Sequence, residues 1–232
     1  MTDLIQVPAV PNLPLPKDEF SKLYLNQLTN VLRLYFNLLN DAESNLADAI
    51  YNLQINTNGT YLKFPYISAS DGTIQYATAD NTPTIVKWST LESGSGFTLN
   101  VDNTATALYD GIYKITYSLQ FANNDNAAHD SIVWLRLNGS TSAADVTDSS
   151  TIFTVPARKS AGVPSYVCGY SEVVFSMNAG DKVGLWWGTD QAATSGGATG
   201  NYIYYRAAQT VPMAYPVTPS AIGSITFLSA LP

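Results

Sequence analysis

Alternating apolar and polar residues dominate the second half of the chain. In residues 111–121, GIYKITYSLQF, every second side chain from Tyr113 to Phe121 is large and apolar or aromatic. Such alternation is typical of a β-strand with one face on a core. Similar runs lie at 83–91, 96–101, 131–139, 150–156, 170–177, 181–188, 201–208 and 220–228. About ten strands at this spacing predict a sandwich or barrel, because no helical crossover fits between them.

The segment before these strands has a period of seven. Its heptad a and d positions are Leu25, Leu28, Leu32, Tyr35, Leu39, Ala42, Leu46, Ala49 and Leu53. This pattern predicts an amphipathic helix over residues 17–56. Asp18 and Glu19, just after Pro16, are typical of a first helical turn.

The width of the apolar stripe bears on how many helices associate. The e and g positions, where a two-stranded zipper carries charges, are largely apolar, as at Val31, Phe36, Leu38 and Ile50. A stripe this wide favours a three-stranded coiled coil over a dimer. The alternative is a single helix packed on its own domain. A break is also conceivable at Asn40–Glu43, NDAE, which resembles a capping box, although the heptad continues in phase across it.

Residues 1–16 contain four prolines, at positions 8, 11, 14 and 16. Proline at this density prevents a helix and favours an extended chain. The apolar residues between the prolines favour an arm that lies on another surface over a disordered leader, which is usually richer in charge. We therefore expect three parts: an extended anchoring arm at 1–16, a helical oligomerisation stem at 17–56 and a β head at 57–232.

Charge narrows the range of partners. The 232 residues carry a net charge of −7, and the 11 basic residues are spread along the chain. No basic stripe could neutralise a row of phosphates, which argues against nucleic acid. No apolar run approaches the roughly 18 residues needed to span a bilayer, so we expect no membrane insertion.

Residues with catalytic or metal-binding chemistry are few. Cys168 and His129 are the only cysteine and histidine, so one chain cannot form a His/Cys zinc cluster. We expect a buried thiol and a solvated turn histidine rather than a catalytic dyad. Asp125 and Asp130 lie in an oxygen-rich segment that could hold calcium, but the spacing of a calcium loop is missing, and a polar hairpin loop is favoured. We expect no catalytic residue and no cofactor.

Aromatic side chains are the remaining functional signal. The residues concerned are Trp186, Trp187, Tyr202, Tyr204 and Tyr205. Because neighbours in a strand point to opposite faces, each run should present an aromatic side chain away from the core. Such side chains either fill a subunit interface, which is the favoured interpretation, or stack on a sugar.

Four segments carry a resemblance to a known family. In order they are GIYKITYSLQF, IVWLRLNG, VVFSMNAGDKVGLWW and PSAIGSITFL. Residues 61–232 resemble the jelly roll of tumour-necrosis-factor ligands and complement-type globular heads, in the version found in tailed-bacteriophage virion proteins. The proline-rich start and helix also resemble small phage structural proteins. The resemblance implies a ten-strand jelly-roll sandwich that forms a homotrimer, and it does not imply catalysis.

The expected function is that of a viral structural protein. The chain would form a homotrimeric virion appendage, such as a capsid decoration protein, head fibre or short tail-associated fibre, assembled in the host cytoplasm. Residues 1–56 would bind a capsid or tail protein while the head projects. One alternative is an adhesin whose head binds a host-surface glycan. The other, a glycan-degrading enzyme, needs a carboxylate pair that the sequence does not reveal.

Overall fold

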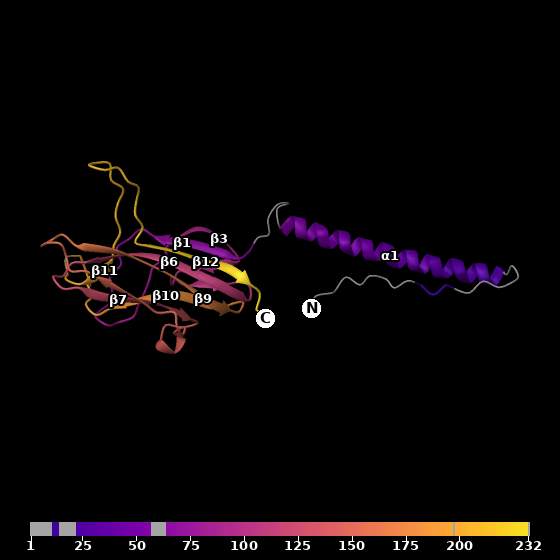
Figure 1. The fold of residues 1–232 in the computed structure, drawn as a ribbon, viewed down its shortest axis with the longest axis horizontal. Coiled ribbons are helices and arrows are strands. Elements are labelled where there is room, and N and C mark those ends of the chain that lie inside the picture. The colour runs from indigo at the N-terminus through magenta and orange to yellow at the C-terminus, as the bar shows by residue number, and fades with distance from the viewer. Residues whose placement is uncertain (1–10, 14–21, 57–63, 197, 232) are drawn as a thin grey trace. The chain divides into compact units, whose positions relative to one another are not determined.

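The computed structural model describes residues 11–13, 22–56, 64–196 and 198–231 (Figure 1). The chain divides into two compact units, Met1–Lys63 and Phe64–Pro232, and each is described here by itself. The predicted arm falls almost wholly outside the described residues. The predicted helix start near Asp18 also lies outside them.

In the first unit, one helix, α1 (Lys22–Asn56), spans 35 residues. It passes through Asn40–Glu43 without interruption, so the capping-box-like sequence does not divide it. No glycine or proline occurs between Lys22 and Asn56, and the heptad keeps its phase. Both features favour a continuous helix.

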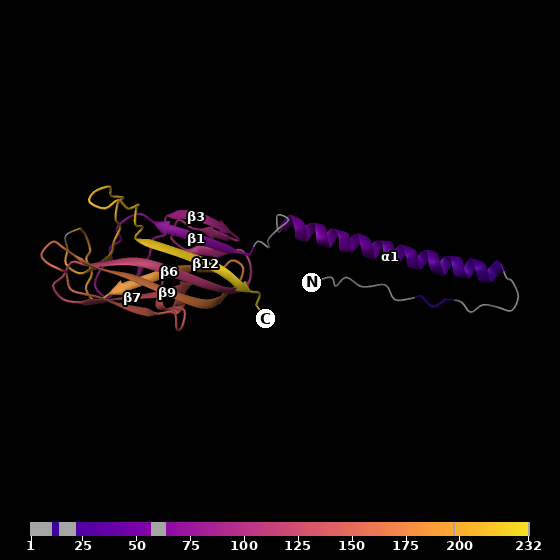
Figure 2. The ribbon, with the colours of Figure 1, turned by 45° about the horizontal axis from the view of Figure 1, so that its top comes forward.

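The second unit is a sandwich of two antiparallel sheets (Figures 1 and 2). Sheet A contains β3 (Thr90–Ser95), β1 (Tyr66–Asp71), β12 (Ala221–Ser229), β6 (Gly111–Asn123) and β9 (Ser165–Met177) in that order, and β11 (Asn201–Ile203) also pairs with β6. Sheet B contains β4 (Phe97–Leu99), β5 (Ala105–Ala107), β10 (Lys182–Thr189), β7 (His129–Leu137) and β8 (Thr151–Val155), and β2 (Thr84–Ile85) pairs with β10. A short 3-10 helix, η1 (Ser142–Ala144), follows β7.

The chain repeatedly switches between the two sheets, as in a jelly roll. Strands β1, β6, β9 and β12 belong to sheet A, whereas β5, β7, β8 and β10 belong to sheet B. The strand pairs β4–β5 and β7–β8 are neighbours both in sequence and in sheet B. Most other consecutive strands lie in opposite layers, so each sheet is assembled largely from distant segments. The longest pairing joins β6 to β9, from Gly111↔Met177 to Asn123↔Ser165. The mainly β, two-sheet architecture predicted from the alternation is confirmed.

The predicted number of strands was too low. The described part of the head has twelve strands, not ten. Strands β1 and β5 were missed, because YISASD and ATA are short and lack large alternating side chains. The run predicted at 83–91 is split: β2 pairs in sheet B, whereas β3 begins at Thr90 in sheet A. Between them the chain crosses from sheet B to sheet A. The side chain of Gln75 fixes this crossing, since its Oε1 accepts from the backbone N–H of Lys87 at 2.7 Å and its Nε2 donates to the backbone carbonyl of Lys87 at 3.2 Å.

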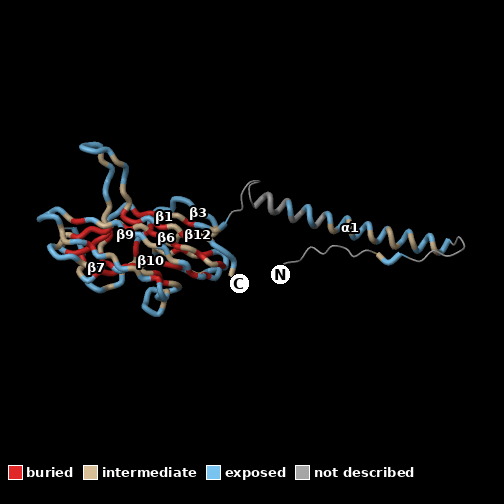
Figure 3. The backbone as a smooth tube through the Cα atoms, viewed as in Figure 1, coloured by how far each residue is buried: buried red, intermediate tan, exposed pale blue. Residues whose placement is uncertain are grey.

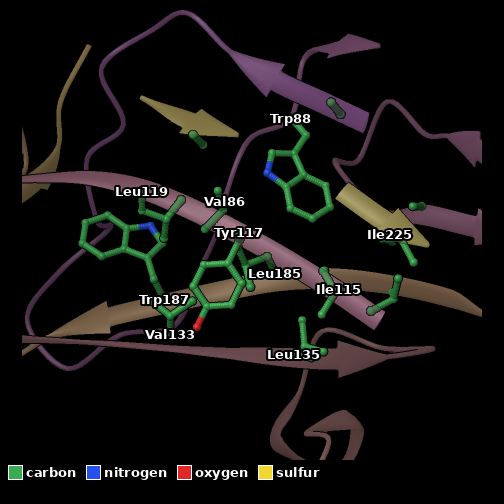
Figure 4. Packing of buried hydrophobic residues seen from close by; sticks show 14 of the residues in the cluster. Val86, Trp88, Ile115, Tyr117, Leu119, Val133, Leu135, Leu185, Trp187 and Ile225 are labelled. Atoms are coloured by element: carbon green, nitrogen blue, oxygen red, sulfur yellow. The ribbon is translucent and has the colours of Figure 1, made fainter. Parts of the chain in front are cut away.

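The core lies between the sheets. Ile115 and Leu119 of sheet A, and Leu135 and Leu185 of sheet B, are completely buried. Figure 4 shows these side chains together with the indoles of Trp88 and Trp187 and the ring of Tyr117. Burial follows the strands of both layers, whereas the connecting loops are largely exposed (Figure 3). Each fully buried aliphatic side chain contributes about 1.5–3 kcal/mol relative to its exposed state.

One glycine is needed for this packing. Gly223 of β12 faces inward, and a Cβ there would lie only 2.4 Å from Cζ2 of Trp88. The indole of Trp88 is 2% exposed and closes the core beneath sheet A. Any larger residue at position 223 would have to displace this ring.

Candidate functional site

The outward side chains of β1, β12, β6 and β9 form what we call the sheet-A face. Two cross-strand rows organise it. One row joins Tyr170, Ser118 and Ile222. The other joins Val174, Lys114, Thr226 and Tyr66. Because strand neighbours alternate, the residues between them point into the core, and the face is set by every second residue.

Large apolar and aromatic side chains of the sheet-A face are exposed on β1, β9 and β12. They are Tyr66, Tyr166, Tyr170, Val174, Ile222 and Leu228. Their exposures run from 40% at Tyr66 to 59% at Tyr170. The charged side chains on the face are Lys114 and Glu172, which pair at 3.6 Å. Polar side chains of β6, such as Lys114 and Ser118, lie between the exposed apolar groups of β9 and β12. A face with so many exposed large apolar groups is typical of interaction surfaces.

Cys168 lies on the same face. The expectation of a buried thiol is wrong, because the residue is exposed. Tyr166, Cys168 and Tyr170 occupy outward positions of β9, and the inward positions between them are filled by Val167 and Gly169. The Cys168 Sγ lies 3.3 Å from the hydroxyl of Ser118.

The apolar stripe of α1 is a second candidate surface. Leu28, Leu32, Tyr35, Leu39 and Ala42 are half-buried, whereas Leu25 and Leu46 are exposed. The side chains of Ala49 and Leu53 lie outside those described. At the e and g positions, Phe36 and Leu38 are 61% and 48% exposed. The helix therefore presents many large apolar side chains to solvent.

His129 is not the solvated turn residue that the sequence suggests. It begins β7, and its side chain is 13% exposed. Its Nε2 lies 2.8 Å from Oδ2 of Asp125, and its Nδ1 lies 3.3 Å from Oδ2 of Asp190. Burial lowers the pKa of His129, but the hydrogen bonds and negative charges of the two carboxylates outweigh it and raise the pKa above 6.5.

The carboxylates proposed for calcium point to different partners. Asp125 accepts hydrogen bonds from His129 and from the backbone N–H of Asn126. Asp130 accepts from the hydroxyl of Thr154 at 2.6 Å. In the part of the chain that the structure describes, no group of three or more His, Cys, Asp or Glu side chains could hold a metal ion. The histidine and the cysteine also have separate partners, so they form no catalytic pair.

The aromatic candidates divide between core and surface. Trp187 is completely buried in the core, and Tyr202 is 9% exposed in a smaller buried cluster. Neither can stack on a ligand or a partner chain from outside. Trp186, Tyr204 and Tyr205 are half-buried on the outside, as strand alternation predicts for Trp186. Tyr204 and Tyr205 follow β11, which ends at Ile203, instead of lying within a longer strand.

Two arginines that the sequence analysis overlooked organise these surface aromatics. The guanidinium of Arg136 lies 4.4 Å from the ring centre of Trp186 and 5.5 Å from that of Trp134. Arg206 contacts three tyrosine rings at 5.5 to 5.8 Å, those of Tyr166, Tyr204 and Tyr215. The Trp134-x-Arg136 spacing was the available signal, since residues two apart in a strand share a face.

Comparison with solved structures finds distant structural similarity. The chain is similar to the Eiger TNF of S. frugiperda, with a TM-score of 0.45 and 11% identity over 72% of this chain and 96% of that chain. No protein-family model and no curated protein matches the sequence. We therefore base the fold on the sheet topology. Among the described residues, no helix is both long and apolar enough to cross a membrane.

Proposed function

We propose that this chain is a viral structural protein that forms a homotrimeric virion appendage. The observation that carries the proposal is the exposed apolar surface of α1. Phe36 is 61% exposed, and Leu25 and Leu46 are 38% and 47% exposed. Isolated helices in water gain little stability without packing of an apolar face, so α1 needs partners along its length. Two further copies of α1 would supply them symmetrically.

The sheet-A face supports the same assembly. It combines exposed apolar side chains with a single internal ion pair, which is the composition expected at the centre of a subunit interface. A stable interface needs about 1,000 Å² of buried surface or more, which stem and head contacts together would supply.

The place of this assembly in a virion rests on sequence resemblance. The proline-rich start, the helix and the four head segments resemble tailed-bacteriophage structural proteins. We propose that residues 1–56 bind a capsid or tail protein and that the head projects from the particle. Peptide mass spectrometry of purified particles should recover the chain in a fixed ratio to the major capsid protein. Its recovery only from infected-cell lysate would contradict a virion location.

The oligomeric state is the direct test of the assembly. Light scattering of the purified full chain should give three times its mass of 25.0 kDa. Replacing Leu32 and Leu39 together with lysine should reduce this mass, because three lysines would meet in each of two core layers of the stem. Leu34→Lys is the matched control, since Leu34 is 62% exposed and lies off the a and d stripe. A monomeric wild-type chain would overturn the proposal.

A further inference from the structure

A hollow on the outward face of sheet B is a candidate ligand site. It has a volume of about 500 Å³ and is lined by Ile85, Thr104, Arg136, Asn138, Lys182 and Trp186, among others. This volume falls within the range of about 300–1,000 Å³ that small-molecule sites occupy. The lining joins two segments that carry the family resemblance, because Arg136 and Asn138 come from IVWLRLNG, and Lys182 and Trp186 come from VVFSMNAGDKVGLWW.

Gly184 lies against three side chains that line the hollow, those of Ile85, Thr104 and Trp186. Lys182, Gly184 and Trp186 occupy alternate positions of β10 and therefore share the outward face. A Cβ at Gly184 would lie 3.2 Å from Nε1 of Trp186 and 3.3 Å from Cδ1 of Ile85. The indole thus occupies space that a side chain at position 184 would take. Together with the apolar atoms of Ile85, it provides an aromatic surface on a rigid strand.

Arg136 holds this aromatic surface in place. Its side chain is only 4% exposed and lies between the rings of Trp134 and Trp186. Its Nε donates to Oδ1 of Asp145 at 2.6 Å, and its Nη1 donates to the backbone carbonyl of Ser140. The guanidinium is therefore neutralised and fixed before any ligand binds, which lowers the ordering cost of binding.

The rim offers polar groups of both signs. The carboxylate of Asp102 is held by the hydroxyl of Thr104 at 2.5 Å. Lys182 supplies a positive charge at the rim. Its ammonium has no carboxylate within 4.0 Å among the described residues. Arg136 is already paired with Asp145, which lies outside the lining. The remaining charges at the hollow are those of Asp102 and Lys182, which balance, so the site has no net preference for an anion.

Asn138 ties the rim to the sheet. Its side chain donates to Oδ1 of Asp181 at 2.7 Å and accepts from the backbone N–H of Lys182 at 2.8 Å. The loop after β7 is therefore fixed against the backbone at the start of β10. The hollow is a formed feature of the sheet rather than a gap between loose loops.

We propose that this hollow binds a neutral saccharide. The apolar face of a hexose ring would stack on the indole of Trp186, and its hydroxyls would meet the carboxylate of Asp102 and the ammonium of Lys182. The balanced charge excludes a preference for acidic sugars. Because the site lies on sheet B, association through the sheet-A face leaves it open, and the proposal does not depend on the oligomeric state.

Saturation-transfer NMR with the full chain tests the proposal. The probes are neutral tetrasaccharides of glucose, galactose, mannose and N-acetylglucosamine, with a galacturonate tetrasaccharide as the acidic comparison. We expect transfer to ring protons of at least one neutral probe. Trp186→Leu should weaken that binding by about 10-fold, as expected for loss of an aromatic stack. Binding of the acidic probe alone, or of no probe, would overturn the proposal.

Two further variants separate binding from folding. Asp102→Asn keeps an acceptor for Thr104 but loses the charge, and it should weaken binding by about 3-fold to 10-fold without changing the thermal midpoint. Tyr109→Leu, at an aromatic residue 58% exposed outside the hollow, should leave binding unchanged. Equal binding by wild type, Trp186→Leu and Asp102→Asn would place the sugar elsewhere and reject this site. A trimer that binds no probe would reject only the saccharide site.

Discussion

The outward faces of sheet A and sheet B are both formed by every second residue of their strands. They differ in the side chains that these positions carry. On sheet A, Tyr170 and Val174 are 59% and 58% exposed and lie four residues apart on the outward side of β9. On sheet B, Arg136 is 4% exposed between two indoles, and Gly184 leaves space beside Trp186. Both faces carry exposed apolar groups, Ile132 and Ile152 being those of β7 and β8, but sheet B adds a hollow with fixed polar groups.

This difference shows that the outward residues, rather than the fold, determine what each face can bind. Protruding apolar groups without polar partners are best covered by another large surface, such as a second copy of the chain. A hollow with an aromatic side and polar groups of both signs suits a small molecule. A jelly roll can therefore use one layer for assembly and the other for ligand binding.

Placing charges on the sheet-A face tests most directly whether this face associates with other copies of the chain. We expect the double variant Val174→Asp, Ile222→Asp to lose association of the heads, because burying unpaired carboxylates in an apolar interface is strongly unfavourable. Light scattering would report the lower mass. Cys168, which is exposed on the same face, should react with a thiol reagent slowly in the assembled wild type and quickly in the variant.

The matched control charges the other face. Ile152 on β8 is 62% exposed on sheet B and pairs with Ile132. Ile152→Asp should leave both the mass and the reactivity of Cys168 unchanged. If Ile152→Asp dissociates the protein and the double variant does not, the two faces have the opposite roles.

Gly223 and Gly184 give a second, smaller contrast between the sheets, because Gly223 faces the core and Gly184 faces outward. Gly223→Ala should destabilise the head by about 1–3 kcal/mol, because the new Cβ lies 2.4 Å from the indole of Trp88. Gly184→Ala should cost less, because the nearest contacts of the new Cβ are longer, at 3.2 and 3.3 Å. Thermal unfolding of both variants measures the difference. Equal midpoints would mean that the core beneath sheet A adjusts as easily as the surface of sheet B.

The sequence predicted the architecture well where periodicity was strong. The alternation in residues 111–121 identified the central strand β6, and the heptad identified α1. It failed at β1 and β5, whose small side chains carry little periodic signal. The switch between sheets near Trp88 was also missed, since a continuous apolar run does not reveal that its two ends pair with different partners.

The surfaces were less predictable than the strands. Alternation correctly indicated that Trp186 and Trp187 point to opposite faces, but it could not say which one enters the core. The burial of His129 between Asp125 and Asp190 depends on residues 61 positions apart, so no local pattern could show it. The place of Gly184 beneath an indole likewise appears only when the cross-strand neighbours are known.

The pH dependence of folding stability should be small and should arise from sheet B, not from the sheet-A face. His129 is the only histidine, and it begins β7 of sheet B, so the sheet-A face has no side chain that ordinarily titrates between pH 5.5 and 7.5. The pKa of His129 is raised in the folded state, although burial opposes the rise, because Asp125 and Asp190 bind the charged ring. Its stabilisation is therefore complete below about pH 6.5 and is lost as the pH rises through the folded pKa.

Asp125 sets the acid limit of the same interaction. Its pKa lies below 3.8, first because of the hydrogen bond from His129, so its contribution is present above that value and is lost as the pH falls through the folded pKa. Denaturant midpoints should thus fall as the pH rises above about 6.5 in the wild type and stay level in His129→Gln, which retains a hydrogen-bonding group without a charge. The mass in solution should not change over this range. If association weakened together with the midpoint, the pH-sensitive loops of sheet B would have to take part in assembly, and the separation of the two faces would fail.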